Sequence, residues 1–378
     1  MPTKSYSLSA RPFKLERYFA KYEFKVKYLL SSSDCESLSM QELVEMASPA
    51  SREMWERLKL GYTESQGHPL LRAEVARLYE RIAPENVLIA APEELIFIAM
   101  QTLLEPGDHV VAMSPAYQSL HEVAGSLGCT VTPWKVRSSR GGWKLDLDEL
   151  EKSLTRRTRL LVINFPHNPT GYLPTCTELD RIVDLARKKD IYLFSDEMYR
   201  LLEYAPDKRL LPVCDLYEKG ISLSGLSKTF SLPGLRVGWL ATRQDELVQR
   251  WLTYHDYTTI CNSAPSEILG IIALQRKERI IDRNLQIIKT NIDKVNEFFL
   301  KHAGQFSWFK PQAGSVAFPR WKGAGSMRKF CQGALDREGV MIVPGDLFGP
   351  DVHHFRLGLG RKNFPEALDH VGAYLDAL

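Results

Sequence analysis

The stretch RLLVINFPHNPTGYLPTCTELDRIVDLARKKDIYLFSDEMY, residues 159–199, decides the fold of this chain. It contains two short apolar runs, Leu160–Asn164 and Ile191–Ser195, which lack polar alternation and therefore predict strands covered on both faces. Between them, Thr177–Lys189 carries apolar residues at helical spacing and predicts an amphipathic helix. A strand, a crossover helix and a second strand predict a parallel sheet.

The same pattern continues on both sides of this unit. Further apolar runs that predict buried strands are Val110–Met113, Thr130–Trp134, Ile221–Ser224 and Val237–Ala241. We therefore expect an α/β fold in which residues 49–282 form a large domain with a mainly parallel sheet covered by helices. Long helical patterns followed by short strands predict a smaller α+β domain over residues 283–378. Residues 1–48 mix aromatic and basic side chains and predict an N-terminal arm that joins the small domain.

The composition excludes several classes of protein. The 378 residues include 49 Lys+Arg and 46 Asp+Glu, a net charge of +3, and 44% hydrophobic residues, which argues against a disordered chain and against a dedicated nucleic-acid binder. No apolar stretch approaches the roughly 20 residues that span a bilayer, and the N-terminus lacks the apolar core of a signal peptide. The 6 cysteines form no CxxC or His/Cys cluster, so no metal site is expected. We expect a cytoplasmic enzyme without nucleic-acid or membrane partners.

Polar segments follow several of the predicted strands, where ligands bind in α/β sheets. PHNPTG (166–171) and DEMY (196–199) follow the two strands of the deciding stretch, GLSKTFSLPGLRVGW begins at residue 225, and SPAYQSL begins at residue 114. These segments would bring chemically useful side chains to one sheet edge: Lys228, Arg236, Asp196, Tyr199, Asn168 and Tyr117.

In order and placement, HNPTG, DEMY and the SxSK-like segment ending at Lys228 resemble the motifs of class I/II aminotransferases. These are pyridoxal-phosphate (PLP) enzymes of fold type I in the aspartate-aminotransferase superfamily, and the resemblance runs from about Leu60 to Arg361. It implies the same fold, and PLP bound to Lys228 as an aldimine. A Schiff-base lysine must lose its proton near neutral pH, and burial beside a cation such as Arg236 favours that.

The resemblance also assigns the groups around the cofactor ring. Asp196 would face the pyridine nitrogen and keep it protonated; a helix N-cap is the alternative role for this residue. Tyr199 and Asn168 would donate hydrogen bonds to the phenolic oxygen, although Asn-Pro-Thr-Gly is also an ordinary turn. Tyr117 resembles the aromatic residue that stacks on the ring, with a core tyrosine as the alternative.

A phosphate needs N–H donors at a helix N-terminus and a fixed cation. The helix is expected to begin at Ala91-Pro92-Glu93, and Ser227 and Arg236 would complete the phosphate site. Pro92 has no N–H, and here the chain departs from the small Ser-Gly or Gly-Ala turn of the family. Ala91 and Glu93 are therefore the expected backbone donors.

Two further residues are assigned by the resemblance. Arg356, in HHFRLGLGR, would grip the substrate α-carboxylate with help from Asn168, since a guanidinium matches a carboxylate bidentately. Arg361 competes for this role but is expected to face solvent. Tyr62, in GYTESQG, would reach the phosphate in the neighbouring subunit, which predicts a homodimer with shared sites.

We expect an aminotransferase that moves an amino group from an L-amino acid to a 2-oxo acid. A PLP-dependent lyase or an amino-acid cyclase or synthase remains open, because SSSDCESLSMQEL (31–43) with DEMYRLLEY (196–204) is similar to capreomycidine-synthase-like members, which cyclise an arginine derivative. A transcriptional regulator would need a helix-turn-helix module, for which residues 1–48 leave no room. A catalytically inactive scaffold is opposed by the presence of Lys228.

Overall fold

A seven-stranded sheet forms the centre of the computed structural model, which describes residues 10–378. In spatial order its strands are β2 (Val87–Ala90), β10 (Gly238–Thr242), β9 (Gly220–Gly225), β8 (Tyr192–Asp196), β7 (Thr158–Asn164), β3 (His109–Ser114) and β4 (Thr130–Lys135). Only β10 runs antiparallel to its neighbours; the other pairings are parallel. The predicted α/β class with a mainly parallel sheet is confirmed, whereas β2 was not anticipated.

Helices cover both faces of this sheet. They are α4 (Pro69–Ala76), α5 (Pro92–Leu103), α6 (Ser119–Ser126), α7 (Leu147–Ser153), α8 (Cys176–Lys188), α9 (Val213–Leu216), α10 (Asp245–His255) and α11 (Ala264–Gln275). Along β7, Leu160 packs into the core beneath α5 and α10, and Leu161 packs into the core beneath α8. This alternation explains why the strand is apolar throughout. The predicted crossover helix α8 is capped by Thr175, whose hydroxyl forms a capping box with Glu178.

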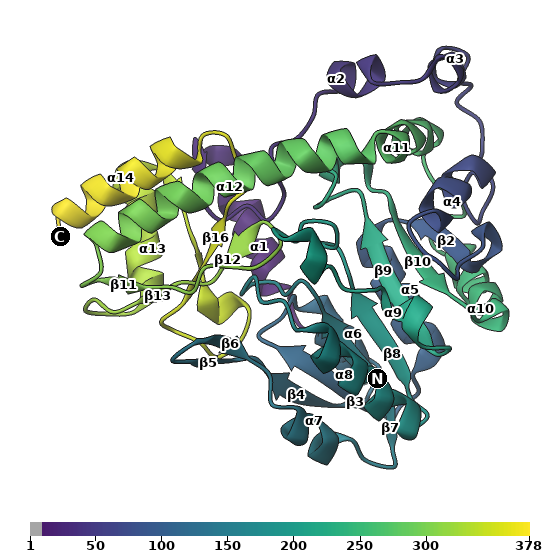
Figure 1. Cartoon of the computed structure of the whole chain (residues 1–378), viewed down its shortest axis with the longest axis horizontal. Coiled ribbons are helices and arrows are strands. Elements are labelled where there is room, and N and C mark those ends of the chain that lie inside the picture. The colour runs from purple at the N-terminus through teal and green to yellow at the C-terminus, as the bar shows by residue number, and fades with distance from the viewer. Residues whose placement is uncertain (1–9) are drawn as a thin grey trace, which may run out of the picture.

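The C-terminal lobe is built from three helices and short strands. Its helices are α12 (Lys277–Lys301), α13 (Met327–Glu338) and α14 (Phe364–Asp376), and its strands are β11 (Phe306–Ser307), β12 (Val316–Ala317), β13 (Arg320–Trp321), β14 (Val340–Met341), β15 (Val343–Pro344) and β16 (Phe355–Gly358). Figure 1 shows α12 running from α11 across to this lobe, with α14 alongside it. Ile280 of α12 belongs to the core beneath α11, and Ile288 to the core of the lobe.

The N-terminal segment crosses between the sheet and this lobe. Helix α1 (Lys14–Tyr22) is followed by β1 (Tyr28–Leu29), which pairs in parallel with β14. The next residues press against β16 so closely that a Cβ on Gly358 would lie 1.7 Å from the carbonyl oxygen of Ser32. Helices α2 (Met40–Glu45) and α3 (Pro49–Glu56) then lead to α4. The domain limits at 48/49 and 282/283 stay a prediction, and residues 1–9 of the expected arm lie outside the described part.

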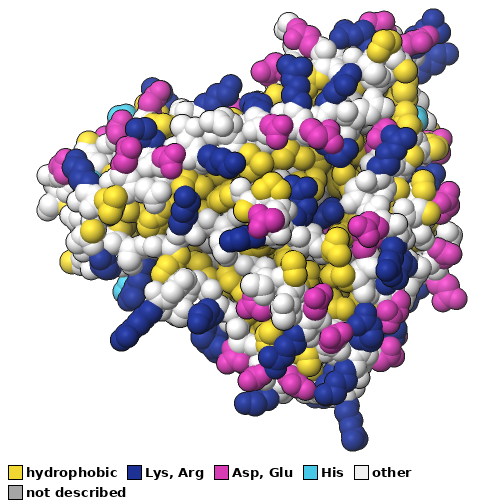
Figure 2. Space-filling model, in the orientation of Figure 1, with side chains coloured by type: hydrophobic (Ala, Val, Ile, Leu, Met, Phe, Trp, Pro, Cys, Tyr) yellow, Lys and Arg dark blue, Asp and Glu magenta, His cyan; other side chains and the backbone are white. Residues whose placement is uncertain are grey.

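The hairpin of β5 (Arg137–Ser139) and β6 (Gly142–Lys144) completes the strands described. Within residues 10–378, no helix combines the length and the apolar character needed to cross a membrane. Acidic and basic side chains intermingle over the face shown in Figure 2, as the small net charge leads one to expect.

Candidate active site

A cavity of about 390 Å³ opens where strands β3, β7, β8 and β9 end, beneath helix α1. Most of the predicted site residues line it together: Pro92, Glu93, Tyr117, Asn168, Asp196, Tyr199, Ser227, Lys228, Arg236 and Arg356. Ala91 is the N-cap of α5 and stands directly before Pro92. Tyr62 is not in this cavity, and its side chain is 91% exposed.

Lys228 reaches across the cavity to the N-terminal segment. Its Nζ donates a hydrogen bond to the Ser33 hydroxyl at 2.9 Å. Burial lowers the pKa of Lys228; Asp34 opposes this effect, and Arg356 and Arg236 reinforce it. These surroundings favour the uncharged amine that a nucleophilic lysine requires.

Asp196 is the last residue of β8, and its carboxylate is buried against the cavity. Oδ1 accepts a hydrogen bond from the Met198 N–H at 3.1 Å, and Asn164 Nδ2 donates to the Asp196 carbonyl oxygen at 2.9 Å. A turn follows this strand, not a helix, so the alternative N-cap role is wrong. Burial raises the pKa of Asp196 to about 6, while Met198 and Lys228 act in the opposite direction. A cation placed beside this carboxylate would restore its charge.

Asn168 lies in the turn after β7, and Tyr199 comes three residues after Asp196. Both residues are buried. The Asn168 N–H donates to Asn164 Oδ1 at 2.8 Å, which fixes the turn after β7. Burial raises the pKa of the Tyr199 hydroxyl. That hydroxyl finds no well-aligned hydrogen-bond partner in residues 10–378, so it is available to a bound molecule.

Arg356, on β16, is a buried cation with incomplete hydrogen bonding. Its Nε and Nη2 donate to the Ser31 carbonyl oxygen at 3.1 and 2.9 Å, and Nη1 donates to Asn168 Oδ1 at 3.3 Å. The ring of Phe348 lies 5.1 Å from the guanidinium carbon. A guanidinium has five N–H donors, so donors remain on both terminal nitrogens for a carboxylate in the cavity.

The N-terminus of α5 and the loop before β10 form the other end of the cavity. Glu93 Oε2 accepts a hydrogen bond from the Ser119 hydroxyl at 3.3 Å. The Ser227 hydroxyl is buried and has no protein partner among the described residues. Arg236 adopts a left-handed backbone conformation, with φ of 55°, and its Nη1 donates to the Pro233 carbonyl oxygen at 3.1 Å. A helix N-terminus, a free hydroxyl and a guanidinium are what a phosphate needs.

The N-terminal segment supplies site residues that the sequence did not reveal. Glu16, Phe19, Glu23, Ser33 and Asp34 line the cavity, and Glu16 accepts a hydrogen bond from the Tyr117 hydroxyl at 2.8 Å. No motif or spacing marks Glu16, Phe19 or Glu23, and the segment SSSDCESLSMQEL, which contains Ser33 and Asp34, indicated a resemblance but no role in the site. The expectation that Arg361 faces solvent is wrong, because its Nη2 pairs with Asp34 Oδ2 at 2.7 Å and only 20% of its side chain is exposed.

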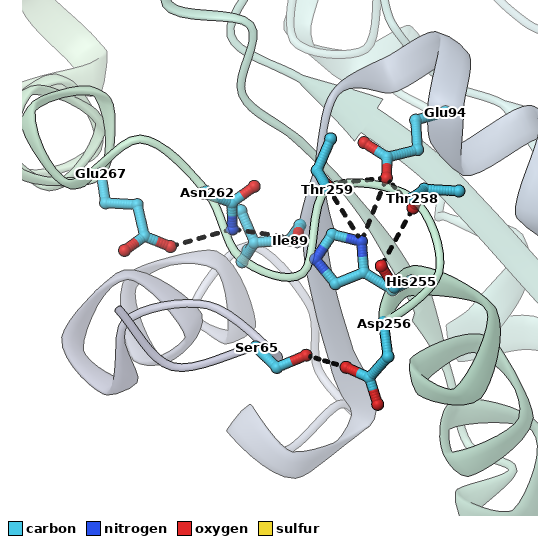
Figure 3. Close-up of polar contacts among 9 residues, drawn as sticks. All are labelled: Ser65, Ile89, Glu94, His255, Asp256, Thr258, Thr259, Asn262 and Glu267. Carbon is cyan, nitrogen blue, oxygen red and sulfur yellow. Dashed lines mark hydrogen bonds and ion pairs between the residues drawn. The ribbon is translucent and has the colours of Figure 1, made fainter. Parts of the chain in front are cut away.

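The loop that follows Tyr62 is tied through Ser65 to the loop after α10 (Figure 3). Ser65 donates a hydrogen bond to Asp256 Oδ1 at 2.8 Å, which ties this loop to the one after α10. Asn262, at the end of that second loop, donates to the Ile89 carbonyl oxygen at 3.1 Å. Tyr257 in the second loop is 89% exposed, like Tyr62, so two tyrosines project from one anchored pair of loops.

Comparison with known proteins identifies the family. Residues 25–371 match aminotransferase class I and II. A capreomycidine synthase from Streptomyces vinaceus is 33% identical over 347 residues, 91% of this chain and 87% of its own. A PLP-dependent aminotransferase from Streptococcus suis superposes with a TM-score of 0.89 at 29% identity, covering 97% of each chain. The PLP-dependent cyclase OrfR superposes equally well, at 26% identity, over 99% of this chain and 100% of its own.

The fold and the cavity define a PLP-dependent enzyme of the transferase class. The chain belongs to the class I and II aminotransferase family. The described residues fit this cofactor, because the buried Ser227 hydroxyl and the N-terminus of α5 suit its phosphate, and the buried Asp196 suits its pyridine nitrogen.

Replacing Lys228 tests its predicted role directly. Lys228→Ala should lose covalent attachment of PLP but keep much of its affinity, because the groups expected at the phosphate are separate. Borohydride reduction followed by peptide mapping should label Lys228 in the unchanged protein. Lys219→Ala is the control, since Lys219 pairs with Asp190 at 2.6 Å away from the cavity and its loss should preserve labelling. Label on any lysine other than Lys228 contradicts the assignment.

Proposed function

We propose that this protein transfers an amino group from an L-amino acid to a 2-oxo acid. The observation that carries the proposal is the convergence of Lys228, Asp196 and Arg356 on one cavity of a chain that matches the class I and II aminotransferase family. A lysine with a lowered pKa, a buried carboxylate and a buried guanidinium with free donors are the groups this reaction requires.

The cofactor would lie between α5 and Asp196. Its phosphate would be held by Ala91, Glu93, Ser227 and Arg236, and its ring would stack on Tyr117. The remaining ring contacts would be Asp196 at the pyridine nitrogen, with Asn168 and Tyr199 at the phenolic oxygen. When bound, the protonated ring supplies an electron sink for a carbanion at the substrate Cα.

The other side chains would position the substrate and move its proton. Arg356 would bind the α-carboxylate through the donors that Ser31 and Asn168 leave free. The Lys228 amine, once free of the cofactor, would take the proton from the substrate Cα and deliver it to the cofactor carbon that receives the amino group. The rings of Phe348 and Phe19, 5.1 and 5.8 Å from the guanidinium, would restrict water around this contact.

The charges left over in the cavity favour a substrate with a cationic side chain. Arg361 neutralises Asp34, whereas Glu23 has no ion-pair partner among the described residues, and Glu16 only accepts from Tyr117. Burial is the largest cause that raises the pKa of Glu23; Asp34 and Glu16 raise it further, whereas Arg361 and Lys228 act in the opposite direction. A cationic group would relieve this repulsion, and an acidic side chain would increase it.

A cyclase or synthase of the same fold is the second candidate. It is favoured by the capreomycidine synthase relative and by the likeness to the cyclase OrfR. Lys228, Asp196 and Arg356 serve either route, so these residues do not discriminate between them.

The working unit is proposed to be a homodimer in which Tyr62 of one subunit completes the phosphate site of the other. The support is that Tyr62 is exposed on an anchored loop, as a residue that serves a neighbouring subunit must be. Leu60, in the same loop, is also 85% exposed and would be covered by such an interface.

The two candidate functions differ in where the nitrogen remains. Given one amino acid and no 2-oxo acid, a transaminase should convert its PLP stoichiometrically to the aminated cofactor and stop, as followed by absorbance. Arg356→Ala should weaken this step by roughly 3–5 kcal/mol, because a buried charged contact is lost. Arg356→Lys should recover only part of this loss, because an ammonium group does not reproduce the two parallel hydrogen bonds that a guanidinium donates to a carboxylate. Continuous turnover that releases ammonia or a cyclised amino acid would instead establish a lyase or cyclase.

Arginine and its neutral isostere citrulline test the charge preference. Arginine should saturate the enzyme at a concentration on the order of tenfold lower than citrulline, given one partly screened ion pair. Glu23→Gln should reduce the difference between the concentrations at which arginine and citrulline saturate the enzyme. Glu45→Gln, on the outer surface of α2, should leave it unchanged. Equal saturation by both amino acids, or tighter binding of glutamate, would count against a cationic substrate.

Subunit mixing tests the shared site. Tyr62→Ala and Lys228→Ala proteins should each be impaired, and their mixture should regain activity, because one site of each hybrid dimer has both residues intact. Two Lys228→Ala preparations mixed under the same conditions provide the baseline. Absence of recovery, with both parents dimeric and exchange demonstrated by labelled subunits, would argue that each subunit works alone.

A further inference from the structure

Two adjacent glutamates in the first turn of α5 face opposite surroundings. Glu94 does not line the cavity. Its carboxylate accepts hydrogen bonds from His255 Nδ1 at 3.1 Å, from Thr259 at 2.8 Å and from Thr258 (Figure 3). Although burial acts to raise it, these hydrogen bonds lower the pKa of Glu94 to about 2. Glu93 lines the cavity instead, with one hydrogen bond, from the Ser119 hydroxyl.

The groups that face Glu93 come from several elements, including the Tyr117 hydroxyl from the segment before α6. Glu16 lies on α1 and Asp196 at the end of β8, and the guanidinium of Arg236 is the facing cation, from the loop before β10. Burial raises the pKa of Glu93 to about 7; Glu16 and Asp196 act in the same direction, whereas Ser119 and Arg236 act against it. Glu93 therefore changes charge near neutral pH.

Acidic residues are common in the first turn of a helix, but not where that turn is expected to bind an anion. The N-terminus of α5 is where the phosphate is expected, and an ionised Glu93 would repel it. Pro92, one residue earlier, has no N–H to offer. A protonated carboxyl group carries no charge and has an O–H donor, which removes the repulsion and replaces the missing donor.

We propose that Glu93 contacts the cofactor phosphate as an uncharged carboxylic acid and supplies the hydrogen bond that Pro92 cannot. The inference rests on the proposed placement of the phosphate at α5. Binding above neutral pH would then take up one proton, so the cofactor would be held less tightly as the pH rises. The phosphate itself ionises near pH 6, and its dianion binds Arg236 better, so without Glu93 the affinity would change in the opposite direction.

The test compares two ligands that lack the aldehyde and so bind without a bond to Lys228. 4′-Deoxypyridoxine 5′-phosphate carries the phosphate and 4′-deoxypyridoxine does not. Their dissociation constants for the cofactor-free, full-length protein are measured by tryptophan fluorescence between about pH 6.5 and 8.5. The phosphorylated ligand should bind about tenfold more weakly at the upper pH, and the ligand without phosphate should not. In Glu93→Gln the affinity should no longer fall with pH.

Matched variants separate the possible causes. Glu94→Gln removes the same charge from the same turn and should keep the pH dependence. Ser119→Ala removes a hydrogen bond that favours ionised Glu93, so it should move the loss of affinity to higher pH; it tests the inference even if Glu93→Gln fails to fold. A pH dependence that persists in Glu93→Gln overturns the proposal. An equal pH dependence of the affinity for both ligands would also overturn the proposal, because the pH dependence would then be assigned to Asp196.

Arg236→Gln distinguishes failure of this inference from failure of its premise. It should weaken only the phosphorylated ligand. If it does so while Glu93→Gln retains the pH dependence, the role of Glu93 is wrong and the phosphate site stands. If the affinities for both ligands are unaffected by Arg236→Gln, the phosphate does not bind at α5 and the proposed arrangement of the cofactor fails as well.

Discussion

The buried guanidinium of Arg356 is the contact on which the site depends. A charge out of reach of water is tolerated only when oxygen acceptors surround it. Ser31 and Asn168 supply these acceptors, the first from the N-terminal segment and the second from the turn after β7. The Arg356 side chain therefore links β16, the N-terminal segment and the turn after β7. Because Ser31 is held in this way, Ser33, two residues later, lies within hydrogen-bond distance of Lys228.

The sheet and the residues at its edge were predictable because their signals are local. Leu160–Asn164 is apolar because both faces of β7 are covered, and the polar residues that follow it lie at the sheet edge by the geometry of parallel strands. Asp196 and Lys228 were found in this way. The family resemblance then supplied their roles, which remain predictions until the variants are measured.

The contribution of the N-terminal segment was not predictable from the sequence. Ser33 meets Lys228 across 195 positions, and Asp34 meets Arg361 across 327, and no periodicity encodes such pairings. Strand β2 was not predicted, although its four apolar residues stand directly before the helix start at Pro92. The proline at the start of α5 was recognised as a missing donor, but the titration of Glu93 depends on burial and on neighbours from other elements.

Helix α12 belongs to both cores, and this restricts how the two halves of the molecule can move. Leu285 packs against both cores, so the helix has no loosely packed stretch between them that could act as a joint. Its 25 residues span roughly 37 Å at 1.5 Å per residue. A tilt of this helix would therefore be a rigid rotation about the region near Leu285, where it contacts both cores. Over that length, a tilt of about 5° displaces one end by about 3 Å relative to the other. A small adjustment beneath α11 would therefore be magnified at the far end of the C-terminal lobe.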